Sequence, residues 1–426
     1  MAIPEDFLHY IWKFRLFDQK GLNTISGEAV EIVNVGLPNS HSGPDFQDSI
    51  IRIGNTLWAG SVEIHLRSSD WLRHKHQSDK SYDSVILHVV GKHDQEIFRT
   101  DGSHVPVLSL ENLIPQKITN AYLHLIECLD WIPCGRQLSR IDRYYIRSWL
   151  YRVEIERLEL KSESVSALLC ELKGDWDEAF YIYLASNFGF KVNAMPFEML
   201  ARSLPQHLLA RYKNRPLQIE SLIFGQAGFL DQKYNDEYPQ LLCKEFEFLK
   251  KKHVLTPIDN YLWKYLRMRP VNFPSCRLAQ FSALVIRSNH IFSKILAEKN
   301  IKSIIDMFKD LPVNTYWDDH YRFDTRTARA KPRIGEECIS NILINTVSVF
   351  LMAYGRNTGS ADHINRSISL LEKLPPETNA LTKRFIEINI IPENAFFSQS
   401  LIQLKKAYCD QKKCLSCGIG MKLLNT

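Results

Sequence analysis

Up to residue 115 the chain alternates short apolar runs with polar turns, and few of these runs are long enough for a helix. Phe7–Phe17 is the exception, because its apolar residues recur at helical spacing. The last run, Ser84–Val90, is almost continuously apolar, as expected for a strand buried on both faces. The pattern predicts a helix at Phe7–Phe17, strands at Val30–Val35, Ser49–Ile53, Leu57–Leu66 and Ser84–Val90, a helix or structured loop at Ser68–Tyr82, and a hairpin of Glu96–Thr100 and Val105–Leu110 around Asp101-Gly102.

Beyond residue 115 the apolar spacing becomes helical and stays so. The clearest predicted helices are Tyr144–Leu172, Trp176–Asn187 and Leu343–Tyr354. Prolines interrupt the pattern at intervals, and no flexible linker separates its segments. We therefore expect an α+β chain with a small α/β domain at residues 1–115, a helical domain at 116–400 and a cysteine-rich end at 401–426 packed on the helical body.

Composition supports a globular protein with ample core. Of 426 residues, 45% are hydrophobic and 24% are charged, which argues against disorder and coiled-coil architectures. The longest apolar runs, such as Thr346–Tyr354, fall short of the roughly 20 residues that a membrane span needs. With no export signal visible, we expect a cytoplasmic protein that does not enter membranes, and nine cysteines that are free thiols or metal ligands.

Charge is unevenly distributed along the chain. Residues 1–115 carry 15 Asp and Glu against 10 Lys and Arg, and the remainder carries 33 against 43. An acidic first part with a basic remainder fits an anion-binding protein whose metal-binding pocket lies in the first part. Ordinary drift of surface charge gives the same pattern, so both interpretations stay open.

The strongest chemical signal is a pair of acids on neighbouring predicted strands. Asp45 precedes the strand at Ser49–Ile53, and Glu63 and His65 lie two residues apart on the next strand. Residues i and i+2 of a strand project from the same face, so Glu63 and His65 point together and Asp45 enters beside them. Two carboxylates form an oxygen-rich site suited to Mg²⁺ or Mn²⁺, which can activate water for attack on a phosphodiester.

The motif and the order of predicted elements resemble those of PD-(D/E)XK nucleases. A helix, a three-stranded meander, a helix and a further strand form the common core of that superfamily, and Asp45, Glu63 and His65 match its metal and catalytic positions. His65 stands where the family usually has lysine. The resemblance thus implies a metal-dependent nuclease, or alternatively a catalytically inactive nuclease-like scaffold that binds nucleic acid or a protein.

Half of the fourteen histidines fall between His41 and His104, around this motif. His74 follows Asp70 at helical spacing, and Arg67 lies on the same strand face as Glu63. Both are candidates for contacting substrate, and both also fit ordinary surface positions. His88, within the fourth strand, fits a buried core residue better than a ligand, although convergence of His65, His74 and His88 would indicate a transition-metal enzyme of another class.

Three cysteines at the C-terminus, Cys409, Cys414 and Cys417, have the spacing of metal ligands. A fourth ligand is expected from Cys134, with Cys128 as the second choice. The set suits Zn²⁺ or an iron–sulfur cluster; some PD-(D/E)XK nucleases are similar in joining one upstream cysteine to three C-terminal ones through such a cluster, with a different spacing. Three free cysteines in a basic tail are the alternative.

The whole chain also resembles an uncharacterised bacterial family known chiefly as a domain of unknown function. The stretches that carry this resemblance are Gly43–Phe46, Trp58–Trp71, Leu87–Val90, Phe224–Gly228, Arg269–Pro274 and Tyr408–Gly420. Phe224–Gly228 lacks the pattern of a phosphate loop and predicts a tight helix-packing turn. Arg269–Pro274 with Arg277 is a donor-rich loop at a helix start, suited equally to binding a phosphate or to a structural salt bridge.

Overall fold

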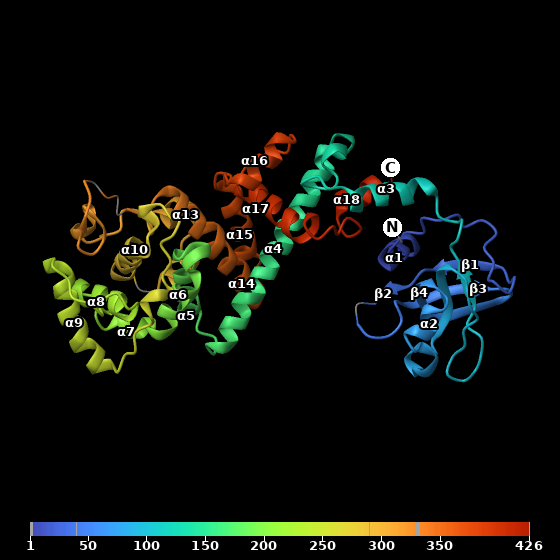
Figure 1. Ribbon diagram of the computed structural model, residues 1–426, viewed down its shortest axis with the longest axis horizontal. Coiled ribbons are helices and arrows are strands. Elements are labelled where there is room, and N and C mark those ends of the chain that lie inside the picture. The colour runs from blue at the N-terminus through green and yellow to red at the C-terminus, as the bar shows by residue number, and fades with distance from the viewer. Residues whose placement is uncertain (1–2, 40, 289, 329, 331–332, 426) are drawn as a thin grey trace. The chain divides into compact units, whose positions relative to one another are not determined.

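The computed structural model describes residues 3–39, 41–288, 290–328, 330 and 333–425, and it divides into two compact units. The first comprises Met1–Trp149 together with Leu404–Thr426, and the second comprises Leu150–Gln403. The fold is α+β, as expected, with the sheet in the first unit and a large helical body in the second (Figure 1). The division differs from the expected boundaries, because residues 116–149 and the cysteine-rich end both group with the sheet.

The elements of the first unit follow the predicted order closely. They are α1 Glu5–Lys13, β1 Val30–Asn34, β2 Leu37–Pro38, β3 Phe46–Ile53, β4 Thr56–Arg67, α2 Asp70–Arg73, β5 Val85–Lys92, β6 Val107–Ser109, α3 Gln116–Glu127, the start of α4 (Arg143–Glu171) and α18 Gly418–Leu424. Short 3₁₀ turns at His76–Ser78, Lys80–Tyr82 and Gly135–Arg140 complete the unit.

The sheet changes from antiparallel to parallel pairing at its centre. Its order is β1-β3-β4-β5-β6, with β2 also paired to β3. The first two pairings are antiparallel, whereas β4 with β5 and β5 with β6 are parallel. A parallel neighbour requires a crossover, and the chain from Ser68 to Ser84, which contains α2, provides it. The strand β5 is buried along Val85–Val90, which explains its continuous apolar run.

The expected hairpin after β5 forms only near its turn. Phe98 and His104 form an antiparallel bridge around Asp101-Gly102, and the Arg99 amide donates to the Ser103 carbonyl at 2.9 Å, while Val107–Ser109 pairs in parallel with β5. The side chains of this segment explain the outcome, because Ile97, Val105 and Val107 pack with Trp71, Val85 and Val90 in one buried cluster. Packing against β5 therefore confines the hairpin to its turn.

The helical body has its own apolar core. Its elements are α4 from Leu150 onward, α5 Trp176–Phe188, α6 Phe190–Ser203, α7 Gln206–Ala210, α8 Pro216–Gln226, α9 Glu237–His253, α10 Pro274–Arg287, α11 Ile291–Ala297, α12 Ile301–Asp306, β7 His320–Arg322, β8 Thr325–Arg326, α13 Glu336–Ile342, α14 Ser348–Thr358, α15 Ala361–Lys373, α16 Ala380–Glu387 and α17 Ala395–Leu404. In this core the rings of Phe180 and Phe292 stack, and both meet the ring of Phe350 edge to face. The Phe224–Gly228 stretch packs as predicted, because Gly225 of α8 lies against the ring of Phe246 in α9.

One helical stretch passes the length and hydropathy test for a membrane span among the described residues. Glu336–Thr358 joins α13 to α14 through a π turn at Leu343–Val347, and its most apolar window has a mean hydropathy of 1.5. Of that window, 78% is buried inside the protein, so the test is weak evidence for a span. The predicted buried helix at Leu343–Tyr354 lies within this stretch.

Candidate functional site

Asp45 and Glu63 are tied together by backbone hydrogen bonds across neighbouring strands. The Asp45 amide donates to Glu63 Oε2 at 3.0 Å, and the Ile64 amide donates to Asp45 Oδ2 at 2.9 Å. Gly43, with φ of 100°, turns the chain so that Pro44 and Asp45 enter β3 in this register. Each carboxylate thus uses one oxygen to hold the other residue's strand, and Glu63 directs its second oxygen elsewhere.

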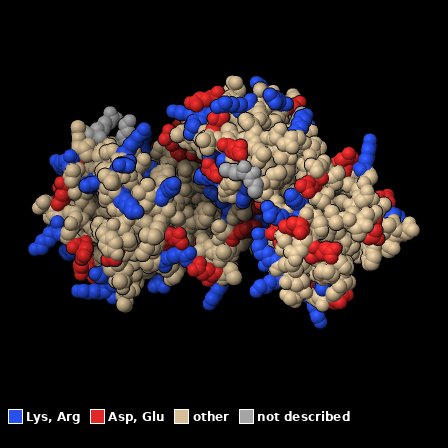
Figure 2. All heavy atoms as spheres, turned by 45° about the vertical axis from the view of Figure 1, so that its right-hand side comes forward, with Lys and Arg blue, Asp and Glu red and all other residues tan. Residues whose placement is uncertain are grey.

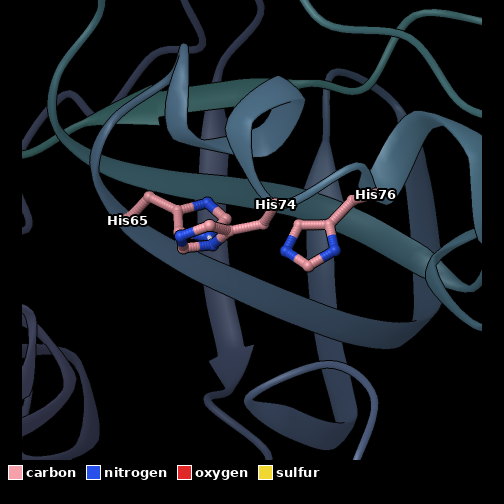
Figure 3. Close-up of side chains that lie close together, drawn as sticks. All are labelled: His65, His74 and His76. Atoms are coloured by element: carbon pink, nitrogen blue, oxygen red, sulfur yellow. Dashed lines mark hydrogen bonds between the residues drawn. The ribbon is translucent and has the colours of Figure 1, made fainter.

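The second oxygen of Glu63 faces a group of histidines. Glu63 Oε1 lies 3.3 Å from His76 Nε2 and 3.6 Å from His65 Nε2, and His65 Nε2 lies 3.0 Å from His74 Nδ1. Figure 3 shows the rings of His65, His74 and His76 gathered at one point, and one nitrogen of each lies within 4.8 Å of the others. His65 and Glu63 come from β4, while His74 and His76 follow α2.

These spacings have the scale of a metal coordination sphere. Zinc–nitrogen bonds of about 2.0–2.1 Å place tetrahedral ligands about 3.3 Å apart, and the three measured separations bracket that value. His76 Nε2 is buried and faces Glu63 Oε1, as two ligand atoms of one metal ion would. One carboxylate with three imidazoles is richer in nitrogen than the predicted oxygen site, and imidazole suits Zn²⁺ and Fe²⁺ better than Mg²⁺.

His88 and His9 contact the residues of this cluster and orient them. His88 Nε2 lies 2.8 Å from His65 Nδ1, so the other nitrogen of His65 is turned toward Glu63. His88 is fully buried on β5 and is paired in register with Glu63. On the other side of Asp45, His9 of α1 places its Nε2 3.3 Å from Asp45 Oδ2.

Burial keeps His65 and His88 neutral. Desolvation, together with nearby His76 and His74, lowers the pKa of His65 to about 3, and burial lowers the pKa of His88 well below its ordinary value. Burial also lowers the pKa of His74 and raises that of Glu63, where His76 acts in the opposite direction. Neutral imidazoles present the lone pairs that a cation needs.

Of the two expected substrate contacts in this unit, His74 belongs to the cluster itself. It is exposed, whereas His65 and His76 are buried, so the cluster has a solvent-facing side at His74. Arg67 lies at the end of β4 with an exposed side chain, and its amide donates to Asp70 Oδ2 at 3.0 Å. Its position beyond the cluster is compatible with substrate contact, which stays a prediction.

The four predicted thiol ligands line one small cavity in the first unit. Cys134, Cys409, Cys414 and Cys417 surround a volume of about 260 Å³ together with Pro133, Tyr408, Lys413 and Gly420. The second-choice ligand, Cys128, does not line it. Burial, reinforced by the neighbouring thiols, raises the pKa of Cys134 to about 12 and that of Cys414 to about 11. A Cβ on Gly420 would lie 2.2 Å from the Cys414 carbonyl oxygen, so only glycine fits beside this turn.

Arg269 and Arg277, the other expected substrate contacts, belong to the helical unit. Both line a separate cleft there, with Arg277 buried and Arg269 exposed. The four expected contacts therefore divide between the two units.

Sequence reasoning missed His9 and undervalued His76 and His88. The helix position of His9 has no feature that points toward Asp45, because the contact joins distant segments. The position of His88 follows from strand pairing, because β5 lies parallel to β4 and places residue 88 opposite Glu63. His76 follows Lys75, whose φ of 64° turns the chain back toward β4, and no local pattern predicts that turn.

Comparison with known proteins identifies the family and no activity. A family model described as "Protein of unknown function (DUF2851)" matches residues 5–380, which include the Asp45–Glu63 site and end before the cysteine tail. Neither the curated proteins nor the solved structures contain a significant match. The chain belongs to this family of proteins of unknown function.

Proposed function

We propose that the protein is a divalent-metal-dependent hydrolase of nucleic acid phosphodiesters, with Asp45, Glu63 and His65 as its catalytic residues. The observation that carries the proposal is the position of Glu63. Its carboxylate holds the Asp45 backbone with one oxygen and presents the other to His65 and His76. Such an arrangement of acid and imidazole around one point, open to solvent at His74, suits a hydrolytic metal.

The strand arrangement supports this chemistry. The antiparallel β1-β3-β4 set is followed by a parallel β5, with Asp45 at the entry to β3 and Glu63 on β4. The order of α1, the antiparallel strands β1, β3 and β4, then α2 and β5 is the element order that the resemblance to PD-(D/E)XK nucleases implies. The fold alone does not define an activity, so the proposal depends on the donor set at the site.

The residues of the site would have different roles in hydrolysis. Glu63 Oε1, His65, His74 and His76 would hold the cation, which when bound lowers the pKa of water and neutralises charge on phosphate oxygens. Asp45 keeps β3 beside β4 and adds negative charge next to Glu63. His88 fixes the ring of His65, which is neutral and therefore cannot replace the charge of the lysine usual at this position.

Nucleic acid is the proposed partner because the remainder of the chain is basic. Residues 116–426 carry 43 Lys and Arg against 33 Asp and Glu, and on the face shown in Figure 2 the basic side chains are interspersed with acidic ones. The alternative function is an inactive nuclease-like scaffold that binds nucleic acid or a protein without cleaving it.

A cleavage assay with matched variants separates these functions. Labelled single- and double-stranded DNA and RNA are incubated with Mn²⁺, Mg²⁺, Zn²⁺ or a chelator. We expect metal-dependent cleavage that falls at least about 100-fold in Glu63→Gln and Asp45→Asn, since each loses charge at the cation. Glu31→Gln, an exposed acid of β1 paired with Arg52, is the control and should retain activity.

Two results would contradict the hydrolase. Cleavage unchanged in both site variants would place the chemistry elsewhere. Absence of cleavage by the wild type under every metal condition, with nucleic acid binding retained, would instead support the scaffold.

We also propose that Cys134, Cys409, Cys414 and Cys417 hold a structural metal centre, either Zn²⁺ or an iron–sulfur cluster. Four thiols line one small cavity, none of them in a disulfide, and together they would supply the four ligands that either centre needs. The centre would fasten the C-terminal segment to the loop at Cys134, since both lie in the first unit.

Metal analysis of anaerobically purified protein tests this centre. We expect zinc, or iron with sulfide and visible absorbance, and a metal content that is lower in Cys414→Ser and Cys417→Ser than in the wild type, whatever cation the Glu63 site holds. Cys170→Ser, an exposed cysteine of α4, should keep it. Protein lacking zinc, iron and sulfide, or full retention of metal by both serine variants, would refute the proposal.

A further inference from the structure

Arg277 of the helical unit is buried without a neutralising acid. It lies in the first turn of α10, is 5% exposed, and its guanidinium stacks on the ring of Phe190 at 4.5 Å. Nη1 donates to Gln280 Oε1 at 2.8 Å and to Cys338 Sγ at 3.0 Å, and Nη2 donates to Asn272 Oδ1 at 2.5 Å. All three acceptors are neutral.

The positive charge of Arg277 is therefore uncompensated by protein. Among the described residues no carboxylate oxygen is recorded within 4.0 Å of its guanidinium, and Nε has no hydrogen-bond acceptor. Burying a charge is costly unless an opposite charge accompanies it. The contrast with Arg157, which is 4% exposed, is informative, because Arg157 Nη1 donates to Glu154 Oε1 at 2.8 Å.

Arg277 borders a cleft that is large enough for a small molecule. The cleft has a volume of about 590 Å³ and is partly open to solvent. Arg269 and Arg333 also line it, as do the amide side chains of Asn272, Gln280 and Asn341. These groups supply several hydrogen-bond donors around the buried guanidinium.

Three acids also line the cleft, but none of them is buried as Arg277 is. Glu336 and Glu337 are exposed. Glu377 is engaged elsewhere, since Oε1 accepts from Asn379 Nδ2 at 3.0 Å and Oε2 accepts from Gln399 Nε2 at 2.5 Å. An anion at the buried end of the cleft would thus meet a guanidinium rather than a carboxylate.

We propose that this cleft is a binding site for a small phosphate-bearing molecule, with its phosphate paired to Arg277 and the rest of the ligand in the open part. A guanidinium binds phosphate through a planar fork of donors, and Arg277 retains Nε–H for that purpose. A cleft larger than a phosphate ion favours a phosphate ester over free phosphate. The site is independent of the proposed hydrolysis and stands whether or not the protein cleaves nucleic acid.

Calorimetric titration and thermal unfolding of the full chain test the site. The probes are inorganic phosphate, pyrophosphate and adenosine 5′-monophosphate, with sodium chloride at matched ionic strength as the blank. We expect saturable binding of a phosphate-bearing probe and a rise in Tm that the blank lacks. Tighter binding of the nucleotide than of inorganic phosphate would identify an ester ligand.

Variants assign the binding to Arg277. Arg277→Gln should weaken binding at least about 10-fold, whereas Arg202→Gln, an exposed arginine paired with Glu171 and Glu198, should leave it unchanged. If Arg277→Gln does not fold, Arg269→Gln at the exposed rim serves instead, with a smaller loss expected. No probe binding by the wild type, equal binding by the folded variants, or equal stabilisation by chloride would overturn the proposal.

Discussion

At the scale of single residues, the sequence predicts those site residues whose side-chain direction follows from the alternation along one strand. Glu63 and His65 project together because strand side chains alternate, and Asp45 meets them because its strand is adjacent. His9, His76 and His88 complete the cluster through contacts with other segments, which local spacing does not encode. The acids were thus predictable, and the number of imidazoles around them was not.

A buried acid of the helical unit allows a pH prediction at the same scale. Burial raises the pKa of Glu220 to about 7, and its hydrogen bonds to Tyr238 and Asn314 only partly oppose that shift. The folded state therefore holds a proton more tightly than the unfolded state, so stability falls as pH rises from about 4.5 to 7.

The variant Glu220→Gln should remove this dependence. It should gain stability relative to wild type between pH 5 and 8, by up to about 1–3 kcal/mol in the free energy of unfolding. Urea unfolding of both proteins across this pH range measures the difference. A difference that does not change with pH would show that Glu220 titrates normally.

At the scale of elements, long apolar patterns were reliable and short ones were not. The strand at Ser84–Val90 and the helix at Trp176–Asn187 match β5 and α5 closely, because each buries a large apolar surface. The hairpin at Glu96–Leu110 is confined to its turn, because Val105 and Val107 pack in one buried cluster with Trp71 and Val107 pairs with β5. A turn signal in the sequence is weak evidence for a hairpin where a neighbouring buried strand has an unpaired edge with which the segment can pair instead.

Helix contacts also allow a prediction at this scale. A Cβ at Gly225 of α8 would lie 2.2 Å from the Phe246 ring of α9, so Gly225→Ala should force the helices apart. We expect a loss of about 1–3 kcal/mol in the free energy of unfolding. Adding Phe246→Leu should recover part of that loss by freeing space, and chemical denaturation of the three proteins checks both effects.

Equal stability of Gly225→Ala and wild type would contradict this close packing. A double variant that is less stable than the sum of the two single losses predicts would also contradict it. Relief of a clash requires the double variant to be more stable than that sum.

At the scale of the whole molecule, the sequence indicated an α+β chain but not its division. The C-terminal segment groups with the sheet-bearing unit through side chains such as Tyr145, whose hydroxyl donates to the Gly418 carbonyl at 3.1 Å. That contact joins residues 273 positions apart, and no composition shift marks it. Cys134 lies between 275 and 283 positions from the three C-terminal thiols, and spacing alone grouped those three thiols only with one another.

The most direct test of the proposed hydrolytic site is the position of a bound cation. Crystals grown with Mn²⁺ or Zn²⁺ and measured at the metal absorption edge would locate it by anomalous scattering. We predict a peak within bonding distance of Glu63 Oε1 and the nitrogens of His65 and His76, absent in Glu63→Gln. A wild-type map without a peak there, under conditions that support cleavage, would contradict a metal-dependent hydrolase at this site.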